Sequence, residues 1–201
     1  MQQDTSSHEA FTTVFARALP YLQTRHNELH TRISLDFAKR LLAAEGGDPR
    51  IVIPAILLHD IGWSKVPEAQ QLLAFGPNVK DPDLTRVHER EGARMAEEIL
   101  VSLGYEGERV GEIVSIIAGH DTRPESSSLH ESIVRDADKL FRLSERGFAI
   151  DCERFEQDPA AYLGWVEEQI AHWFFTTSGA ELARQETAAR YRELRSAQSI
   201  A

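Results

Sequence analysis

The chain has 201 residues, 42% of them hydrophobic, and a formal net charge of −10 at pH 7. This length supplies one full hydrophobic core and is short for two, so we expect a single compact domain over residues 1–201. The negative charge argues against a surface built for duplex nucleic acid or anionic lipid, because both ligands need clustered Lys and Arg side chains.

The N-terminus and the cysteine usage predict the compartment. Residues 1–7 are polar and lack both the basic start and the apolar run of a secretory signal. No run of about eighteen apolar residues occurs, so we expect no membrane span. Cys152 is the only cysteine, which excludes a disulfide framework and a thiolate cluster, and we expect it to be a small buried or half-buried side chain. These features fit a protein of the reducing cytoplasm.

Apolar residues recur at helical spacing in most segments, whereas strand-like alternation bounded by hairpin turns is hard to find. We therefore expect an all-α fold. In chain order, the helical positions and segments are Ile33, Phe37 and Leu41; Val52, Ala55 and Ile56; Met95, Ile99 and Leu103; 110–118; 133–143; and 162–175. Three Asp-Pro pairs, at Asp48, Asp81 and Asp158, predict helix starts with Asp as the N-cap and Pro as the first helical residue.

The longest irregular stretch runs from about Trp63 to Asp83 and contains Pro67 and Gly76. It directly follows the adjacent pair His59-Asp60. This position predicts a loop or a short-helix flap over a site at that pair.

The first candidate site residues lie on two predicted helices. His30 lies one turn before Ile33, on the same face as the apolar residues that follow, so we expect it to point inward. His59 and Asp60 directly follow the strongly apolar segment 51–58. Placing both polar residues at a buried helix end costs desolvation free energy unless something binds them.

Further candidates lie in the second half of the chain. His88 and His120 lie on or beside apolar helix faces. Asp136 and Asp138 interrupt the apolar segment 133–143, where an inward carboxylate needs a cation or hydrogen-bond donors. Because neighbours two apart on a helix diverge, we expect only one of these two carboxylates to be a ligand.

Imidazole nitrogens and carboxylates bind first-row divalent ions, and a metal site gathers several of them from different elements. Any one of these histidines alone could be a satisfied core residue. Together, the candidates at apolar helical positions, with an adjacent His-Asp among them, predict a bound metal ion. The remaining histidines lack this setting and are interpreted as surface or structural residues: His8, His26, His130 and His172.

This pattern resembles the HD-domain superfamily, whose signature is a histidine, then His-Asp at a helix end, then a distant aspartate. The matching residues are His30, the pair His59-Asp60 within Leu-His-Asp-Ile-Gly, and Asp138 within Ala-Asp-Lys-Leu. The family's last aspartate sits in an Ala-Asp-x-Leu context, which selects Asp138. Asp136 then becomes a candidate for a residue that supports the ligands by hydrogen bonding.

The resemblance covers about residues 29–143 and implies an HD-type helical bundle. We place the core of the domain at about 26–145 and a C-terminal helical extension at about 158–196. The four-residue signature implies a mononuclear site of the metal-dependent phosphohydrolase kind.

Some members of the superfamily hold two metal ions by inserting two histidines between the His-Asp pair and the last aspartate, with the first aspartate as a bridge. His88 and His120 occupy that order in this chain. The resemblance therefore implies one or two divalent ions, among Mn, Mg, Fe, Ni and Co, with Asp60 between them when two are bound.

The activity implied by the resemblance is hydrolysis of a small phosphate ester or nucleotide by metal-activated water. We expect Asp60 and Lys65 to take part in catalysis. Lys65, Arg123 and Lys139 lie close to ligands in the sequence and are candidates to contact the substrate phosphate, although long cationic side chains are more often solvated.

Other sequence features limit this interpretation. Glu68 and Asp121 are candidate general bases, but surface carboxylates or capping partners are the simpler interpretation. Members that hydrolyse cyclic dinucleotides continue His-Asp-Ile-Gly with Lys and carry a later Gly-Tyr-Pro. Here Trp63 takes the place of that Lys and no Gly-Tyr-Pro occurs, so we do not expect this activity.

Two other functions stay open. The same ligand order fits di-iron oxygenases of this superfamily, which act on organophosphonates or polyol-like substrates. A module that binds a nucleotide without converting it is the third interpretation, and the complete set of signature ligands argues against it. Association of the chain into a homo-oligomer is also left open by the sequence.

Overall fold

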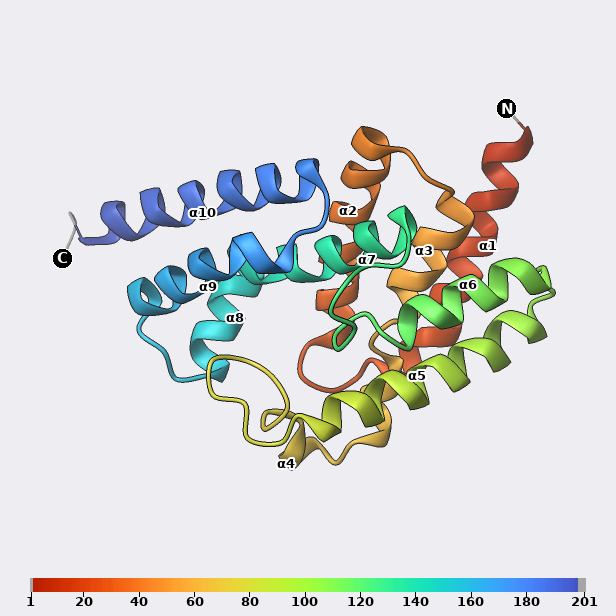
Figure 1. Cartoon of the computed structure of the whole chain (residues 1–201), viewed down its shortest axis with the longest axis horizontal. Coiled ribbons are helices and arrows are strands. Elements are labelled where there is room, and N and C mark those ends of the chain that lie inside the picture. Colours follow the sequence, from red (N-terminus) through yellow and green to blue (C-terminus); the bar gives the residue numbers. More distant parts are fainter. Residues whose placement is uncertain (1, 199–201) are drawn as a thin grey trace.

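The computed structural model of the chain describes residues 2–198, and within this range it is built of helices without a strand (Figure 1). The predicted all-α fold is confirmed. Among the described helices, none combines the length and the apolar character that a bilayer crossing requires. The α-helices and the 3-10 helices (η) are α1 (Gln2–Ala18), η1 (Leu19–Tyr21), α2 (Asn27–Glu45), α3 (Pro49–Leu58), η2 (Ile61–Lys65), α4 (Glu68–Gln71), α5 (Asp83–Ser102), α6 (Gly107–Ile117), α7 (Leu129–Leu140), η3 (Phe141–Leu143), α8 (Glu145–Arg154), α9 (Pro159–Trp173) and α10 (Thr177–Gln198).

Two of the three Asp-Pro pairs begin helices as predicted. Asp48 and Asp158 cap α3 and α9, because their side-chain oxygens accept backbone N–H groups of the first turn. The third prediction is wrong by one residue. α5 begins at Asp83 with Pro82 as the N-cap, and Asp81 accepts the backbone N–H of Asp83 at 3.2 Å.

The helix α3 forms the centre of the core. Its sequence is apolar after Arg50, and every residue from Ile51 to Leu58 is buried. It packs against α1, α2, α6 and α7, so other helices surround its C-terminal end. The next two residues, His59 and Asp60, are therefore held inside the molecule, where both are buried.

The turn after α3 packs closely on α5. A Cβ atom at Gly62 would overlap the carbonyl oxygen of His88 and the backbone nitrogen of Gly92. Only glycine permits this approach of the two backbones. The close packing brings Asp60 and Trp63 against His88.

The segment after His59-Asp60 consists of short helices and a loop, as the sequence predicts. It contains η2 and α4, followed by the irregular residues 72–82. The loop folds back on itself, since the backbone N–H of Lys80 donates to the carbonyl of Leu73 at 2.8 Å. Trp63 and Phe75 of this segment line a cavity beside the predicted ligands.

The helices α9 and α10 lie side by side and pack on α7 (Figure 1). The turn between them is fixed to α7, because Asp136 accepts hydrogen bonds from the backbone N–H groups of Phe175 and Thr176. Gly179, in the first turn of α10, leaves room for this carboxylate, since a Cβ atom there would overlap Oδ2 of Asp136. Cys152 on α8 is buried, as predicted.

Candidate metal centre

The six predicted ligands come from five helices and meet at one place in the interior. Five of them are buried and His30 is half-buried. They lie on α2 (His30), at the end of α3 (His59 and Asp60), on α5 (His88), just after α6 (His120) and on α7 (Asp138), and they form overlapping groups in which a metal ion could be held.

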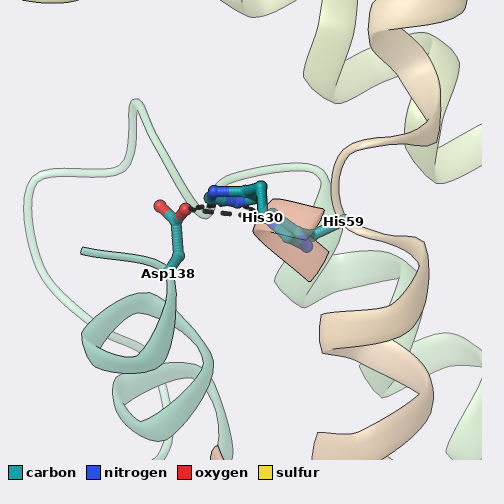
Figure 2. A group of neighbouring side chains, drawn as sticks. All are labelled: His30, His59 and Asp138. Atoms are coloured by element: carbon teal, nitrogen blue, oxygen red, sulfur yellow. Dashed lines mark hydrogen bonds and ion pairs between the residues drawn. The ribbon is translucent and has the colours of Figure 1, made fainter. Parts of the chain in front are cut away.

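One half of the cluster consists of His30, His59 and Asp138, which point toward one another (Figure 2). The Nε2 atoms of His30 and His59 lie 3.0 Å apart. Oδ1 of Asp138 lies 3.1 Å from Nε2 of His30 and 3.6 Å from Nε2 of His59. Three ligand atoms from three helices therefore face one point.

The other half of the cluster consists of His88, His120 and Asp121. The Nε2 atoms of the two histidines lie 3.3 Å apart. Oδ2 of Asp121 lies 3.8 Å from Nε2 of His88 and 3.6 Å from Nε2 of His120. Asp121, which the sequence favours as a surface carboxylate, is thus a further candidate ligand.

The carboxylate of Asp60 lies between the two halves. Its Oδ1 is 3.6 Å from Nε2 of His59 and 3.6 Å from Nε2 of His88, and its Oδ2 is 3.5 Å from Nε2 of His30. Asp60 is therefore close to histidines of both halves.

The spacing of these atoms suits metal coordination. Two ligand atoms bound to one ion at about 2.1 Å lie roughly 3.0–3.4 Å apart in octahedral or tetrahedral geometry. The distances within the cluster fall at or slightly above this range, from 3.0 Å to 3.8 Å. The donor set of imidazole nitrogens and carboxylate oxygens fits a divalent first-row ion.

Neighbouring groups orient the ligands. Nδ1 of His59 and Nδ1 of His120 each lie 2.8 Å from a backbone carbonyl, that of Ile56 and of Ile117 respectively, and each donates its N–H there. This arrangement leaves both Nε2 lone pairs directed at the cluster. The indole N–H of Trp63 donates to Oδ1 of Asp60 at 3.1 Å.

The cluster has excess negative charge, which also favours a bound cation. Burial opposes ionisation of Asp60, but the surrounding histidines and Arg25 hold the pKa of this carboxyl well below its usual range. Burial likewise opposes protonation of His59, but Asp60 and Asp138 raise the pKa of this imidazole to about 9. Burial lowers the pKa of His88 to about 3. A divalent ion would take the place of the proton that His59 otherwise binds.

Lys139 joins the two halves on the cavity side. Its Nζ donates to Oδ1 of Asp121 and to Oδ2 of Asp138, at 2.6 Å each. Burial opposes its charge, but these two carboxylates raise the pKa of the ammonium, which therefore stays protonated. The three carboxylates of the cluster outnumber this one ammonium.

Three cationic side chains were predicted to contact the substrate, and of these only Lys139 lines the cavity. Lys65 is exposed at the end of η2 and does not line the cavity. It follows buried Trp63 by two residues, and in a 3-10 helix this spacing directs its side chain away from the side that Trp63 occupies. Arg123 forms an ion pair with buried Glu131 and donates to the carbonyl of Ser115 at 3.0 Å. Closeness to the ligands in sequence did not bring either side chain to the site.

Two further candidate carboxylates lie away from the cluster. Glu68 is exposed and does not line the cavity, which agrees with a surface carboxylate. Asp136 does not support the ligands, because its hydrogen bonds go to Phe175 and Thr176 in the turn before α10. Its position two residues before Asp138 turns it to the opposite side of α7.

The other histidines behave as surface or structural residues. His26 and His172 are exposed. His130 lies with Nδ1 2.6 Å from the carboxylate of Glu112, and its Nε2 accepts the backbone N–H of Asp48 at 2.9 Å. The side chain of His8 lies outside the described residues.

Sequence reasoning missed a group of arginines at the cavity. The space beside the ligands measures about 50 Å³ and is lined by Arg25, Arg142 and Arg154, as well as by Lys139. Arg142 and Arg154 both pair with buried Asp151. These residues are distant in sequence and occur in no motif, so no local signal could have grouped them.

Comparisons with known proteins identify a family and a similar fold. The family model of the HD domain matches residues 28–143, more than half of the chain. Among solved structures, the chain is similar to the crystal structure of a predicted HD superfamily hydrolase from an uncultured Thermotogales bacterium. The TM-score is 0.63 at 19% sequence identity, over 92% of this chain and 90% of that one, and at this identity the likeness shows the fold alone. A search of curated proteins finds no match.

Proposed function

The chain belongs to the HD-domain family, and from this premise we propose that it is a metal-dependent hydrolase of small phosphate esters or nucleotides. The observation that carries the proposal is the convergence of four imidazole Nε2 atoms and three carboxylates beside a cavity lined with basic side chains. A phosphoryl group needs both features, because its oxygens bind cations.

The residues divide naturally between two ions. His30, His59, Asp60 and Asp138 would hold the first. His88 and His120 would hold the second with Asp60 as the shared ligand, and Asp121 adds a carboxylate on that side. A divalent ion in such a site supplies Lewis acidity and lowers the pKa of a water molecule toward neutrality.

The chain's own residues fix the geometry and the charge of the site. Trp63 donates its indole N–H to Oδ1 of Asp60 and so orients the carboxylate whose two oxygens face the histidines of both halves. Lys139 keeps its proton and stabilises negative charge at the cavity wall; it is therefore no general base. The backbone carbonyls behind His59 and His120 keep both rings in the tautomer that directs Nε2 inward.

The space around the ligands supports a small substrate. The cavity of about 50 Å³ shares Phe75, Lys139 and Arg142 with an adjoining groove of about 370 Å³. Trp165 and Trp173 also line that groove. A phosphoryl group would occupy the inner cavity, and the organic part of the ester would lie in the groove against the aromatic rings.

Phosphate release tests this proposal. The full chain, with its metal content verified by elemental analysis, is supplied with Mn²⁺, Mg²⁺, Co²⁺, Ni²⁺ or Fe²⁺ and assayed against nucleotides and a chromogenic phosphate ester. We expect turnover with at least one ion, and loss of turnover together with bound metal in a His59→Ala/Asp60→Ala variant. Absence of turnover across the panel, with metal confirmed bound, would contradict it.

A second candidate function is favoured by the four histidines, because an imidazole-rich site with two halves also suits a pair of iron ions. A di-iron oxygenase would act on an organophosphonate or a polyol-like substrate. Aerobic purification from iron-rich culture separates the two candidates. A two-iron protein with visible absorption and O₂ consumption would favour the oxygenase, whereas a colourless protein that holds Mn, Mg or Ni favours the hydrolase.

A further inference from the structure

The loop before α2 has an unusual backbone. Arg25 and His26 both adopt left-handed conformations, with φ of 53° and 60°. Such conformations are uncommon for residues other than glycine and persist where the surroundings hold them. Here Arg154 holds the loop, since its Nη2 donates to the carbonyl oxygen of Arg25 at 2.6 Å.

This backbone places the side chain of Arg25 in the cavity beside the metal-ligand cluster. Its guanidinium carbon lies 4.6 Å from the ring centre of Trp63 and 4.8 Å from that of Phe75. Trp63 in turn stacks on His88, with ring centres 4.2 Å apart and planes inclined by 10°. Arg25, Trp63 and His88 thus form one stack that ends at a candidate ligand.

The guanidinium of Arg25 has unused hydrogen-bond donors. Its Nε and Nη2 are buried without a hydrogen-bond partner. The aromatic rings satisfy the face of the guanidinium, but its N–H donors point outward in the plane of the group and need oxygen acceptors. In the described part of the chain, no carboxylate forms an ion pair with it.

The other basic side chains of the cavity are already engaged. Lys139 donates to Asp121 and Asp138, and both Arg142 and Arg154 pair with Asp151. Among the basic side chains that line this cavity, Arg25 is therefore the one with buried N–H donors that have no acceptor. A buried guanidinium without acceptors is costly, and the cost is recovered when an anion binds.

We propose that Arg25 forms an anion subsite that binds the phosphoryl oxygens of the substrate beside the metal-ligand cluster. This inference rests on the proposed hydrolase function and adds the residue that positions the substrate. The planar fork of a guanidinium binds two oxygens of one phosphoryl group at once, which a lysine in its place could not do. Contact with the Trp63 ring holds the guanidinium at the cavity wall, which is also lined by His30, Asp60 and Asp138.

Binding of inorganic phosphate tests the subsite without requiring turnover. Phosphate is titrated calorimetrically, at fixed ionic strength, into the full chain loaded with metal. We expect Arg25→Gln to weaken phosphate binding at least tenfold and Arg25→Lys to retain part of the affinity. Bound metal should be unchanged in both variants, and the melting temperature should be equal or higher, because a buried unpaired charge is removed.

Arg90→Gln is the matched control. It removes the same charge from the exposed face of α5, where Arg90 pairs with Glu91 at 3.3 Å, and it should leave phosphate affinity unchanged. Equal phosphate affinity in Arg25→Gln and the natural chain would overturn the proposal, and so would a metal-loaded natural chain that binds no phosphate. Phosphate binding that depends on Arg25, without turnover of any ester, would instead refute the hydrolase function and leave the subsite standing.

Discussion

Asp136 and Asp138 lie two residues apart on α7 and both are buried, yet they face opposite sides of the helix. Asp136 faces the turn between α9 and α10. There it accepts the backbone N–H of Phe175 at 2.9 Å, the backbone N–H of Thr176 at 2.9 Å and the hydroxyl of Thr176 at 2.6 Å. Burial outweighs these hydrogen bonds and raises the pKa of Asp136 to about 6.

Asp138 faces the metal-ligand cluster. Its neighbours are the Nε2 atoms of His30 and His59 and the ammonium of Lys139. Burial opposes ionisation here too, but Lys139 and these two histidines hold the pKa of Asp138 well below its usual range. The comparison shows that a buried carboxylate met by fixed N–H and O–H donors stabilises the fold, whereas one met by imidazole Nε2 atoms can bind a metal.

Substitution of Asp138 should have the largest effect on function. Asp138→Asn removes a charged ligand. We therefore expect the affinity for the metal ion and the turnover rate each to fall at least about a hundredfold, while the fold persists. Elemental analysis, turnover and circular dichroism measure the three quantities. Asp36→Asn, at an exposed position on α2, is the control. An Asp138→Asn variant with full metal content would place the metal elsewhere.

Substitution of Asp136 should lower stability and leave metal binding unchanged. Asp136→Ala leaves three donors without an acceptor, and we expect the free energy of unfolding to fall by about 3 kcal/mol. Urea unfolding measures this change. Metal content per folded molecule should stay the same, because the side chain does not face the ligands. A large loss of metal at unchanged stability would reverse the roles assigned to the two aspartates.

The loss of unfolding free energy caused by Asp136→Ala should depend on pH. The folded-state pKa of Asp136, about 6, lies above its ordinary value of 3.8. Its contribution to stability is therefore complete below about pH 4 and is lost as the pH rises through 6. The destabilisation by Asp136→Ala should accordingly be larger at pH 4 than at pH 7, by up to about 2 kcal/mol. A difference that grows with pH would show that the carboxyl ionises readily in the fold.

The smallest effect is expected at Thr176. Thr176→Val removes the hydroxyl that donates to Asp136 and that also accepts the backbone N–H of Gly179 at 2.9 Å. Both backbone donors to the carboxylate remain, so we expect a loss of only about 1–2 kcal/mol in the free energy of unfolding. Urea unfolding with parallel metal analysis checks this; a loss equal to that of Asp136→Ala would mean that the backbone hydrogen bonds contribute nothing.

Much of the site could be predicted from the sequence because each ligand lies on, or just after, a helix of clear periodicity. His30 shares a face with apolar residues, and His59 and Asp60 end the most apolar helix of the chain. Periodicity fixes the direction of a side chain relative to its own helix. It also predicted that Asp136 and Asp138 would diverge, although family context was needed to choose between them.

The cations of the site could not be predicted in the same way. Lys65 and Arg123 lie near ligands in the sequence, but η2 turns the first outward and Glu131 engages the second. Arg25 lies in an irregular loop, where no periodicity gives a direction, and it reaches the cavity through a left-handed backbone. A long cationic side chain that is close to a ligand in the sequence does not predict a substrate contact, because its position depends on acceptors from other elements.

The sequence by itself determined the all-helical character of the fold, the apolar setting of the histidines and the order of the ligands, since these depend on spacing within single segments. The family resemblance already implied Asp60 as a bridge, whereas only the tertiary structure decided that Asp121 joins one group of histidines and that Lys139 connects the carboxylates of the two groups. These relations depend on how α3, α5, α6 and α7 pack. A local sequence pattern indicates on which face of its helix a residue lies, whereas the packing of the helices determines which residues contact that face.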